Sequence, residues 1–245
     1  QLQSHGIRVL GSTIIGLENH TPENIDQVIA RAVRHDTDFH QFMLYTPLPG
    51  TPLHAELTEQ GRMKDEREYE VGDIHGQLIM NYRHPHLNDE QTAEYMVRAF
   101  DADFAANGPS TVRIVRTTLA GWQRYKDHPD PRIRRRFRWE GRELGNALTA
   151  LVAAARGYFG QQPALRAKMS ALLEELYREF GWKARLFGSL GGRWLLSRIR
   201  REERNLAAGW TYEPPTFYER NAAVTDNPAA ELCRCTQPAC ILARS

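Results

Sequence analysis

The fold of this chain is decided by the stretch Phe39-His-Gln-Phe-Met-Leu-Tyr-Thr-Pro-Leu-Pro-Gly-Thr-Pro-Leu53. Its first six residues, rich in aromatic and aliphatic side chains, predict a β-strand that ends at Leu44. Three prolines and a glycine follow, and the strand cannot continue through them because proline lacks an N–H donor and fixes φ. Ligands of α/β sheets bind at the carboxyl ends of strands. The rigid turn therefore either shapes a binding mouth or only connects the strand to a helix.

A second strand and a helix precede this stretch. Residues 5–16 form a β-branched, mostly apolar run without strict alternation, which is typical of a strand buried on both faces of a parallel sheet. Thr21 and Pro22 match the N-cap and first position of a helix, and an apolar stripe continues from Ile25 to Val33. The order strand, helix, strand predicts a right-handed parallel crossover.

Helices dominate the rest of the chain. Thr51 and Pro52 repeat the cap-and-proline start and predict a short helix that ends near Gly61. Residues 63–86 show no clear period and are interpreted as an irregular covering segment. Asn88 and Gln91 have the spacing of a capping box. They open a region, residues 87–218, in which we expect five helices, followed by a disordered tail over 219–245.

Composition limits the classes of function. The chain has 245 residues, with 41% hydrophobic and 25% charged residues, as in ordinary globular proteins. A net charge of +2 is too small to indicate a nucleic-acid partner. No run approaches the roughly 18 apolar residues of a transmembrane helix. All three cysteines lie in the last 13 residues, so no disulfide framework is expected, and a reducing cytoplasm is the simplest compartment.

Two parallel strands do not make a complete sheet. All-parallel sheets occur with both faces covered, and a two-strand unit would leave apolar edges open. The chain also begins at Gln1 and enters a strand almost at once. We therefore expect further strands of the same sheet elsewhere in a longer polypeptide.

Residues 11–21 and 42–53 together resemble the last two strands of radical S-adenosylmethionine enzymes, and most closely the subgroup with an N-terminal cobalamin-binding domain. The resemblance covers residues 5–62. It implies an α/β fold, with the last two strands of a partial TIM-type barrel in residues 1–62 and an all-α helical domain after it. Residues 73–77, 81–86 and 209–218 are similar to the C-terminal extension of that subgroup.

The resemblance also implies where S-adenosylmethionine would bind. Residues that end the two strands would pack against the adenosyl group and its adenine: Ile14, Ile15, Gly16, Met43, Leu44, Tyr45 and Thr46. Most of these contacts are made by backbone and apolar groups. One departure is visible, because the family commonly has Leu-Pro-Gly-Glu-Thr after the glycine whereas this chain has Leu17-Glu-Asn-His-Thr21. His20 thus replaces the family's Glu, which puts a polar contact there in doubt.

The family holds a [4Fe–4S] cluster with three cysteines spaced CxxxCxxC, and that spacing does not occur in this sequence. Because thiolates hold such clusters, the chain alone is predicted to be inactive, with the cluster ligands and the cobalamin domain elsewhere in the same polypeptide. The thiolates of Cys233, Cys235 and Cys240 could coordinate a metal ion. Their spacing fits neither the family loop nor a zinc pair, and a frayed terminus with reactive thiols is the preferred interpretation.

Histidines of the covering segment are candidates for the substrate side of the barrel mouth. His75, His84 and His86, with Asp73, could bind a metal or act as acid and base. The alternative is that they hydrogen-bond the irregular backbone around them. Five arginines between Arg132 and Arg138 are interpreted as the solvated side of an amphipathic helix rather than a nucleic-acid site.

The leading hypothesis is therefore the C-terminal part of a cobalamin-linked radical S-adenosylmethionine enzyme. Methyl transfer to an unreactive carbon is the expected reaction, although the family also has non-methylating members. The expected substrate is a small molecule, with a lipid or other apolar metabolite as one candidate. The competing hypothesis is a non-catalytic helical interaction module whose strand–helix–strand start is a docking unit.

Overall fold

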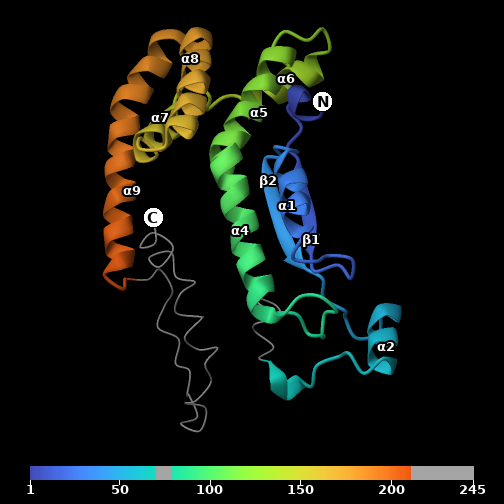
Figure 1. Ribbon diagram of the computed structural model, residues 1–245. Helices are drawn as coiled ribbons and strands as arrows, with labels where there is room; N and C mark the ends of the chain where they lie inside the picture. Colours follow the sequence, from blue (N-terminus) through green and yellow to red (C-terminus); the bar gives the residue numbers. More distant parts are fainter. Residues whose placement is uncertain (70–78, 211–245) are drawn as a thin grey trace.

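The computed structural model of the protein describes residues 1–69 and 79–210. The chain is mostly helical and contains a small two-stranded parallel sheet near its N-terminus (Figure 1). The predicted layout of an α/β unit followed by helices is confirmed at this level. Membership of the two strands in a larger barrel stays a prediction.

The sheet pairs β1 (Leu10–Ile15) with β2 (Phe39–Leu44), in parallel and in register from Leu10 opposite Phe39 to Ile15 opposite Leu44. Helix α1 (Ile25–Val33) connects the strands, as the sequence predicts. It begins three residues later than expected. Residues 21–24 form a turn instead, in which the Asn24 side chain accepts from the backbone N–H of Thr21 (3.0 Å) and donates to the carbonyl of Asn19 (2.8 Å).

The two faces of the sheet have different surroundings. Ile15, Phe42 and Leu44 lie in one buried cluster with residues of α1 and of α4 (Asp89–Asn107). The opposite face remains open, since Leu10 is 64% and Phe39 44% exposed. The expectation that the first strand is buried on both faces is therefore wrong for the described residues. Both neighbouring helices cover the same face, and no described element covers the other.

Local capping chemistry sets the next helices. Helix α2 (Pro52–Glu59) begins at the predicted cap, where Thr51 Oγ1 accepts from the backbone N–H of His54. A 3₁₀ turn, η2 (Glu66–Glu68), follows. Helix α4 begins with the predicted capping box, because Asn88 and Gln91 each accept a hydrogen bond from the other's backbone N–H. Met63 and Tyr82 form an isolated antiparallel bridge between these elements.

A second cluster of buried residues joins the later helices. The helices and turns of this part are α5 (Ser110–Tyr125), α6 (Pro131–Glu140), α7 (Ala147–Tyr158), α8 (Pro163–Leu186), η3 (Phe187–Gly191) and α9 (Gly192–Ala207). Figure 1 shows α7, α8 and α9 on the side of α4 and α5 that lies away from the sheet. The predicted break near Gly145 separates α6 from α7. The predicted tail lies outside the described residues.

Buried polar groups join the sheet to α4 and α5 at the amino ends of the strands. The Asp38 carboxylate, fully buried, accepts from the backbone N–H of Val9 (2.8 Å) and from Thr117 Oγ1 (2.5 Å). Arg113 pairs with Asp103 (2.7 Å) and donates to the carbonyl of Thr37 (2.8 Å). Each of these bonds crosses from one element to another, so this end of the sheet is fixed firmly.

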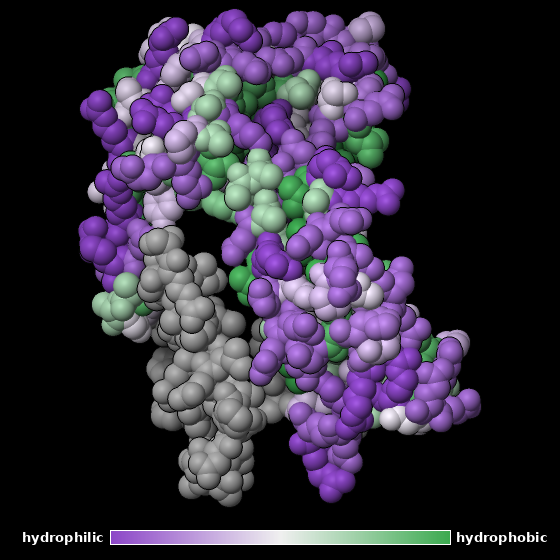
Figure 2. All heavy atoms as spheres, in the orientation of Figure 1, coloured by the Kyte–Doolittle hydropathy of each residue, from purple (hydrophilic) through white to green (hydrophobic). Residues whose placement is uncertain are grey.

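Hydrophilic side chains cover most of the face seen in Figure 2, and the hydrophobic ones are scattered among them. Among the described residues, no helix has both the length and the apolar character needed to cross a membrane.

Candidate functional site

The candidate site lies at the carboxyl ends of β1 and β2. Gly16 follows β1, and residues 45–47 follow β2. The described part of the covering segment returns to this end, where Met80 and Tyr82 are 1% exposed and Asn81 6%. Asp73 and His75 lie outside the described residues. The covering segment thus contributes buried side chains to the edge at which α/β sheets bind ligands.

Side-chain hydrogen bonds fix the backbone that follows β1. Tyr82 Oη donates to the carbonyl of Gly16 (2.8 Å), and His84 Nε2 lies 2.9 Å from the carbonyl of Leu17. The N–H groups of Gly16 and Leu17 donate to His20 Nδ1 at 3.1 and 3.3 Å. Gly16 has φ +84°, and a Cβ placed on it would lie 2.9 Å from Met80 Sδ. Only glycine fits both the conformation and the close approach.

Hydrogen bonding fixes the tautomer of His84. Its Nδ1 accepts from the backbone N–H groups of His86 and Leu87, both at 3.1 Å. Nε2 therefore carries the proton and donates to Leu17. Both nitrogens are used by backbone groups, as the alternative interpretation of these histidines expects, and no lone pair is left for a metal. The exposed His86 ring lies 6.1 Å from that of His84.

Burial keeps the imidazoles of His20 and His84 neutral. The pKa of His20 is lowered mainly by burial and then by the nearby His84. The pKa of His84 is also lowered by burial, against a smaller opposing effect of its bond to Leu17. Burial likewise raises the pKa of the Tyr82 hydroxyl well above its ordinary value. His20, His84 and Tyr82 are therefore uncharged near neutral pH.

The turn after β2 is fixed from the same segment. Asn81 Nδ2 donates to the carbonyl of Pro47 (2.8 Å), and Thr46 Oγ1 donates to the carbonyl of Leu44 (3.2 Å). The rings of Tyr45 and Tyr82 meet edge to face, with centroids 6.2 Å apart. The proline-rich turn is thus tied to the covering segment, and it presents a rigid rim.

The structure places the residues predicted for the adenosyl pocket on both faces of the sheet. Ile14 and Met43 are paired in register on the open face, whereas Ile15 and Leu44 point into the buried cluster. Half-buried Tyr45 and Thr46 continue the strand at its end. The structure thus brings Ile14 and Met43 together beside the open face. Their role in binding S-adenosylmethionine stays a prediction.

Met80, Asn81 and Tyr82 are site residues that sequence reasoning missed. The stretch 81–86 attracted attention only through a resemblance, and the segment around it has no hydrophobic period. The signal that could have found them is a tyrosine and a methionine close together in an otherwise polar segment. Such apolar residues need a buried location, and the strand ends supply it.

No group of three or more histidine, cysteine or acidic side chains in residues 1–69 and 79–210 could hold a metal ion. Cys233, Cys235 and Cys240 lie outside these ranges. The preferred interpretation of that tail, a frayed terminus with reactive thiols, and the metal-binding alternative therefore both stay predictions.

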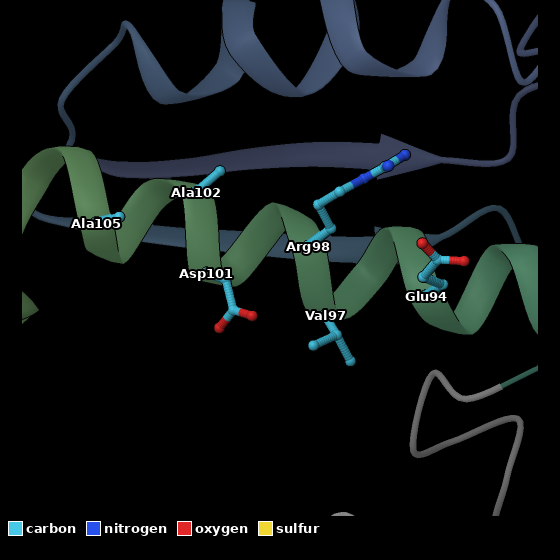
Figure 3. A pocket seen from close by; sticks show the side chains of 6 residues that line it. All are labelled: Glu94, Val97, Arg98, Asp101, Ala102 and Ala105. Carbon is cyan, nitrogen blue, oxygen red and sulfur yellow. The ribbon is translucent and has the colours of Figure 1, made fainter. Parts of the chain in front are cut away.

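A separate hollow lies on one side of α4 (Figure 3). Six residues line it: Glu94, Val97, Arg98, Asp101, Ala102 and Ala105. Figure 3 shows Val97 and Asp101 pointing away from the strands, while Arg98 points toward them and pairs with Asp26 of α1 (3.0 Å). Because a single helix lines it and it is open to solvent, this hollow does not enclose a ligand.

Comparisons with known proteins give one short similarity. No family model matches the chain, and no solved structure matches it. Over 48 residues, or 20% of its length, the chain is 44% identical to a protein of Pyrococcus horikoshii named as an uncharacterized methyltransferase. The match spans 10% of that protein. The chain is thus similar to a methyltransferase over one fifth of its own length.

Proposed function

We propose that the chain is the C-terminal part of a cobalamin-linked radical S-adenosylmethionine enzyme that transfers a methyl group. It supplies the last two strands of a partial barrel, part of the adenosyl pocket and a helical domain beside the substrate. The observation that carries the proposal is the open apolar face of the sheet, next to the fixed carboxyl ends of its strands.

The placement of the helices supports a barrel. In a barrel of parallel strands the helices pack outside and the other face of the sheet turns inward. Here α1 and α4 both cover one face. The other face presents a row of apolar side chains, Leu10, Ile14, Phe39 and Met43, interrupted only by Ser12 and Gln41. Further strands of the same barrel would enclose this row.

The hydrogen bonds after β1 indicate how the adenosyl group would be held. The N–H groups of Gly16 and Leu17 are taken by His20, and their carbonyls by Tyr82 and His84. What this chain offers a ligand is therefore apolar packing against Ile14 and Met43, beside the rim of the β2 turn. His20, at the position of the family's Glu, serves the local backbone.

The chemistry divides between this chain and the rest of the polypeptide. Cysteines that would hold the cluster, and the cobalamin domain, are expected outside this chain, and these groups would supply the radical and the methyl group. The residues of this chain would position the adenosyl group and exclude water from it. The similarity to a named methyltransferase supports methyl transfer as the outcome.

The test uses the complete polypeptide, reconstituted with iron and sulfide under anaerobic conditions. We expect S-adenosylmethionine consumption with release of 5′-deoxyadenosine. An Ile14→Asn/Met43→Asn variant should weaken S-adenosylmethionine binding about tenfold or more, because two polar groups would face the adenosyl group. Phe39→Asn lies on the same open face at the far end of β2, and it should change the affinity less than about twofold.

Two results would contradict the proposal: no 5′-deoxyadenosine from a cluster-loaded sample, or equal loss of affinity in the two variants. The gene offers an independent check. An open frame upstream of Gln1 should encode the cobalamin domain and the three-cysteine loop. A start codon directly before Gln1 would instead favour the alternative, a helical interaction module whose open sheet face docks a protein.

A further inference from the structure

The hairpin formed by α8, η3 and α9 has its small residues inside. After Gly181, where φ is +62°, the chain turns and continues helically from Trp182 through η3 into α9. The buried side consists of Ala184, Gly188 and Gly192. A Cβ on Gly192 would lie 2.7 Å from that of Ala153 on α7, so this helix approaches its neighbours very closely.

Large apolar side chains lie on the opposite side. Two residues along a helix correspond to a rotation of about 200°, so Leu186, Leu190 and Trp194 point away from the buried small residues. Leu190 is 60% and Trp194 67% exposed. Trp182, 70% exposed, precedes them by the same spacing of four. We call Trp182, Leu186, Leu190 and Trp194 the outer row. Amphipathic helices normally have the reverse arrangement, with large residues buried.

The π-helical turn keeps the outer row straight. In a regular α-helix each step of four residues advances by about 40°, so three steps would rotate the row by about 120°. The π-helical turn over Phe187–Gly191 is wider than an α-helical turn, so each residue in it rotates by a smaller angle about the axis. This offsets much of the 120° rotation of the row. The four side chains therefore share one strip of surface.

The helix that carries the outer row is strongly basic. Residues 182–201 contain six lysines and arginines and no acidic residue. Arg193, Arg200 and Arg201 are exposed. In Figure 1, α9 runs along an outer edge of the molecule, and Figure 2 shows mostly hydrophilic side chains along that edge. Tryptophan and leucine flanked by arginine and lysine are the composition of helices that lie in the interface of anionic membranes.

We propose that the outer row and its flanking basic residues dock the protein on the surface of an anionic lipid bilayer. The helix lies in the plane of the interface, with the tryptophan rings at the level of the headgroups and the arginines extended to the phosphates. A second copy of this surface is a poor partner, because it carries the same positive charges and would repel the first. The proposal is independent of the proposed function.

The experiment measures binding of the full chain to vesicles by flotation. We expect binding to vesicles of phosphatidylcholine mixed with phosphatidylglycerol, none to phosphatidylcholine alone, and weaker binding as salt is raised. Leu190→Ser/Trp194→Ser should lower the partition coefficient about tenfold or more, since both side chains enter the interface. Arg200→Gln/Arg201→Gln should lower it about fivefold for each charge removed. Circular dichroism should show that both variants stay folded, because all four side chains are exposed.

Matched controls come from α6. Trp139, 63% exposed, lies outside the outer row, and Trp139→Ser should bind as the wild type does. Exposed Arg132 and Arg135 provide the same change in net charge when replaced by glutamine, again with unchanged binding. The proposal is overturned if the wild-type chain does not bind anionic vesicles or if the outer-row variant binds them as the wild type does. It is equally overturned if the α6 variants lose as much affinity for the vesicles as the outer-row variant. It is also overturned if sedimentation without lipid shows a dimer that the outer-row variant dissociates.

Discussion

Gly16 is the residue at which the first strand meets the covering segment, and its substitution tests that contact. An alanine at φ +84° is strained, and its Cβ would also meet Met80 Sδ. We expect Gly16→Ala to lower the free energy of unfolding by about 2–4 kcal/mol, from backbone strain and overpacking together. Urea denaturation of the two proteins measures the difference.

Gly50 separates these two effects. It has nearly the same φ, +82°, but nothing lies within 4 Å of a Cβ placed there. Gly50→Ala should therefore cost only the strain, about 1–2 kcal/mol. Equal losses in the two variants would mean that Met80 does not pack tightly on Gly16.

Acid should destabilise the protein through three half-buried or buried histidines. Burial is the main cause that lowers the pKa of His20, His40 and His84 below 6.5. The unfolded chain then binds protons that the folded chain does not. The stability that these neutral imidazoles contribute is complete above about pH 6.5 and is lost as the pH falls below it. Urea midpoints at roughly pH 7.5 and 5.5 measure this loss.

The His84→Asn variant tests the contribution of one of these histidines to the pH dependence of stability. The asparagine side-chain oxygen can replace Nδ1 as the acceptor for the backbone, but it does not titrate. His84→Asn should make the dependence of stability on pH shallower. His54→Asn, on α2 outside the cluster, is the matched control. A pH dependence that is unchanged in His84→Asn would exclude this histidine as a cause.

The sequence predicted the place of the candidate site better than the roles of its residues. The proline-rich turn after Leu44 located the carboxyl ends of the strands, because backbone chemistry is local. The state of His84 depends on Leu17, 67 residues away, and on the neighbouring N–H groups. Such a contact is set by the tertiary fold, and no spacing in the sequence encodes it.

At the scale of elements, the caps at Thr51 and Asn88 were predictable, whereas the cap expected at Thr21 and the buried faces were not. Thr51 and Asn88 begin helices as expected, since a cap needs only its own side chain and the next turn. The apolar residues of α4 do not by themselves show which side of the helix is buried. Phe100 is 46% exposed, whereas Tyr95 and Ala99 are buried. The position of the sheet and α1 decides which side of α4 is covered, and this information lies in other elements.

A buried ion pair bridges the break between α4 and α5. Arg113 and Asp103 are 5% and 7% exposed, and Arg113 also bonds the carbonyl before β2. Arg113→Gln should cost about 3–5 kcal/mol, because it leaves the Asp103 carboxylate buried without its partner. Thermal or urea unfolding measures the loss. The double variant Asp103→Leu/Arg113→Met should lose less than the single one, since no unpaired charge remains.

An exposed pair provides the comparison. Arg67, whose side chain is 89% exposed, pairs with Asp65 at 2.8 Å. Arg67→Gln should leave the free energy of unfolding nearly unchanged, because surface ion pairs generally contribute little. Similar losses at Arg67 and Arg113 would show that the buried pair does not stabilise the junction of α4 and α5.

At the scale of the whole molecule, the main feature is that covered and uncovered apolar surface lie on the same two strands. The sequence indicated an incomplete sheet, because two parallel strands cannot cover themselves. It did not indicate which face stays open. That depends on α4 packing on the same face of the sheet as α1, where Met96 and Ala99 join the buried cluster.

The open face should therefore tolerate polar substitutions that the covered face does not. Leu10→Ser/Phe39→Ser should change the free energy of unfolding by less than about 1 kcal/mol, because both side chains already contact water. Phe42→Ser, on the covered face and 2% exposed, should cost about 3–5 kcal/mol. The double variant should also bind less of a dye that fluoresces on apolar surface. A loss above about 2 kcal/mol in the double variant would mean that the chain covers this face itself, and the proposed barrel would then lose its main support.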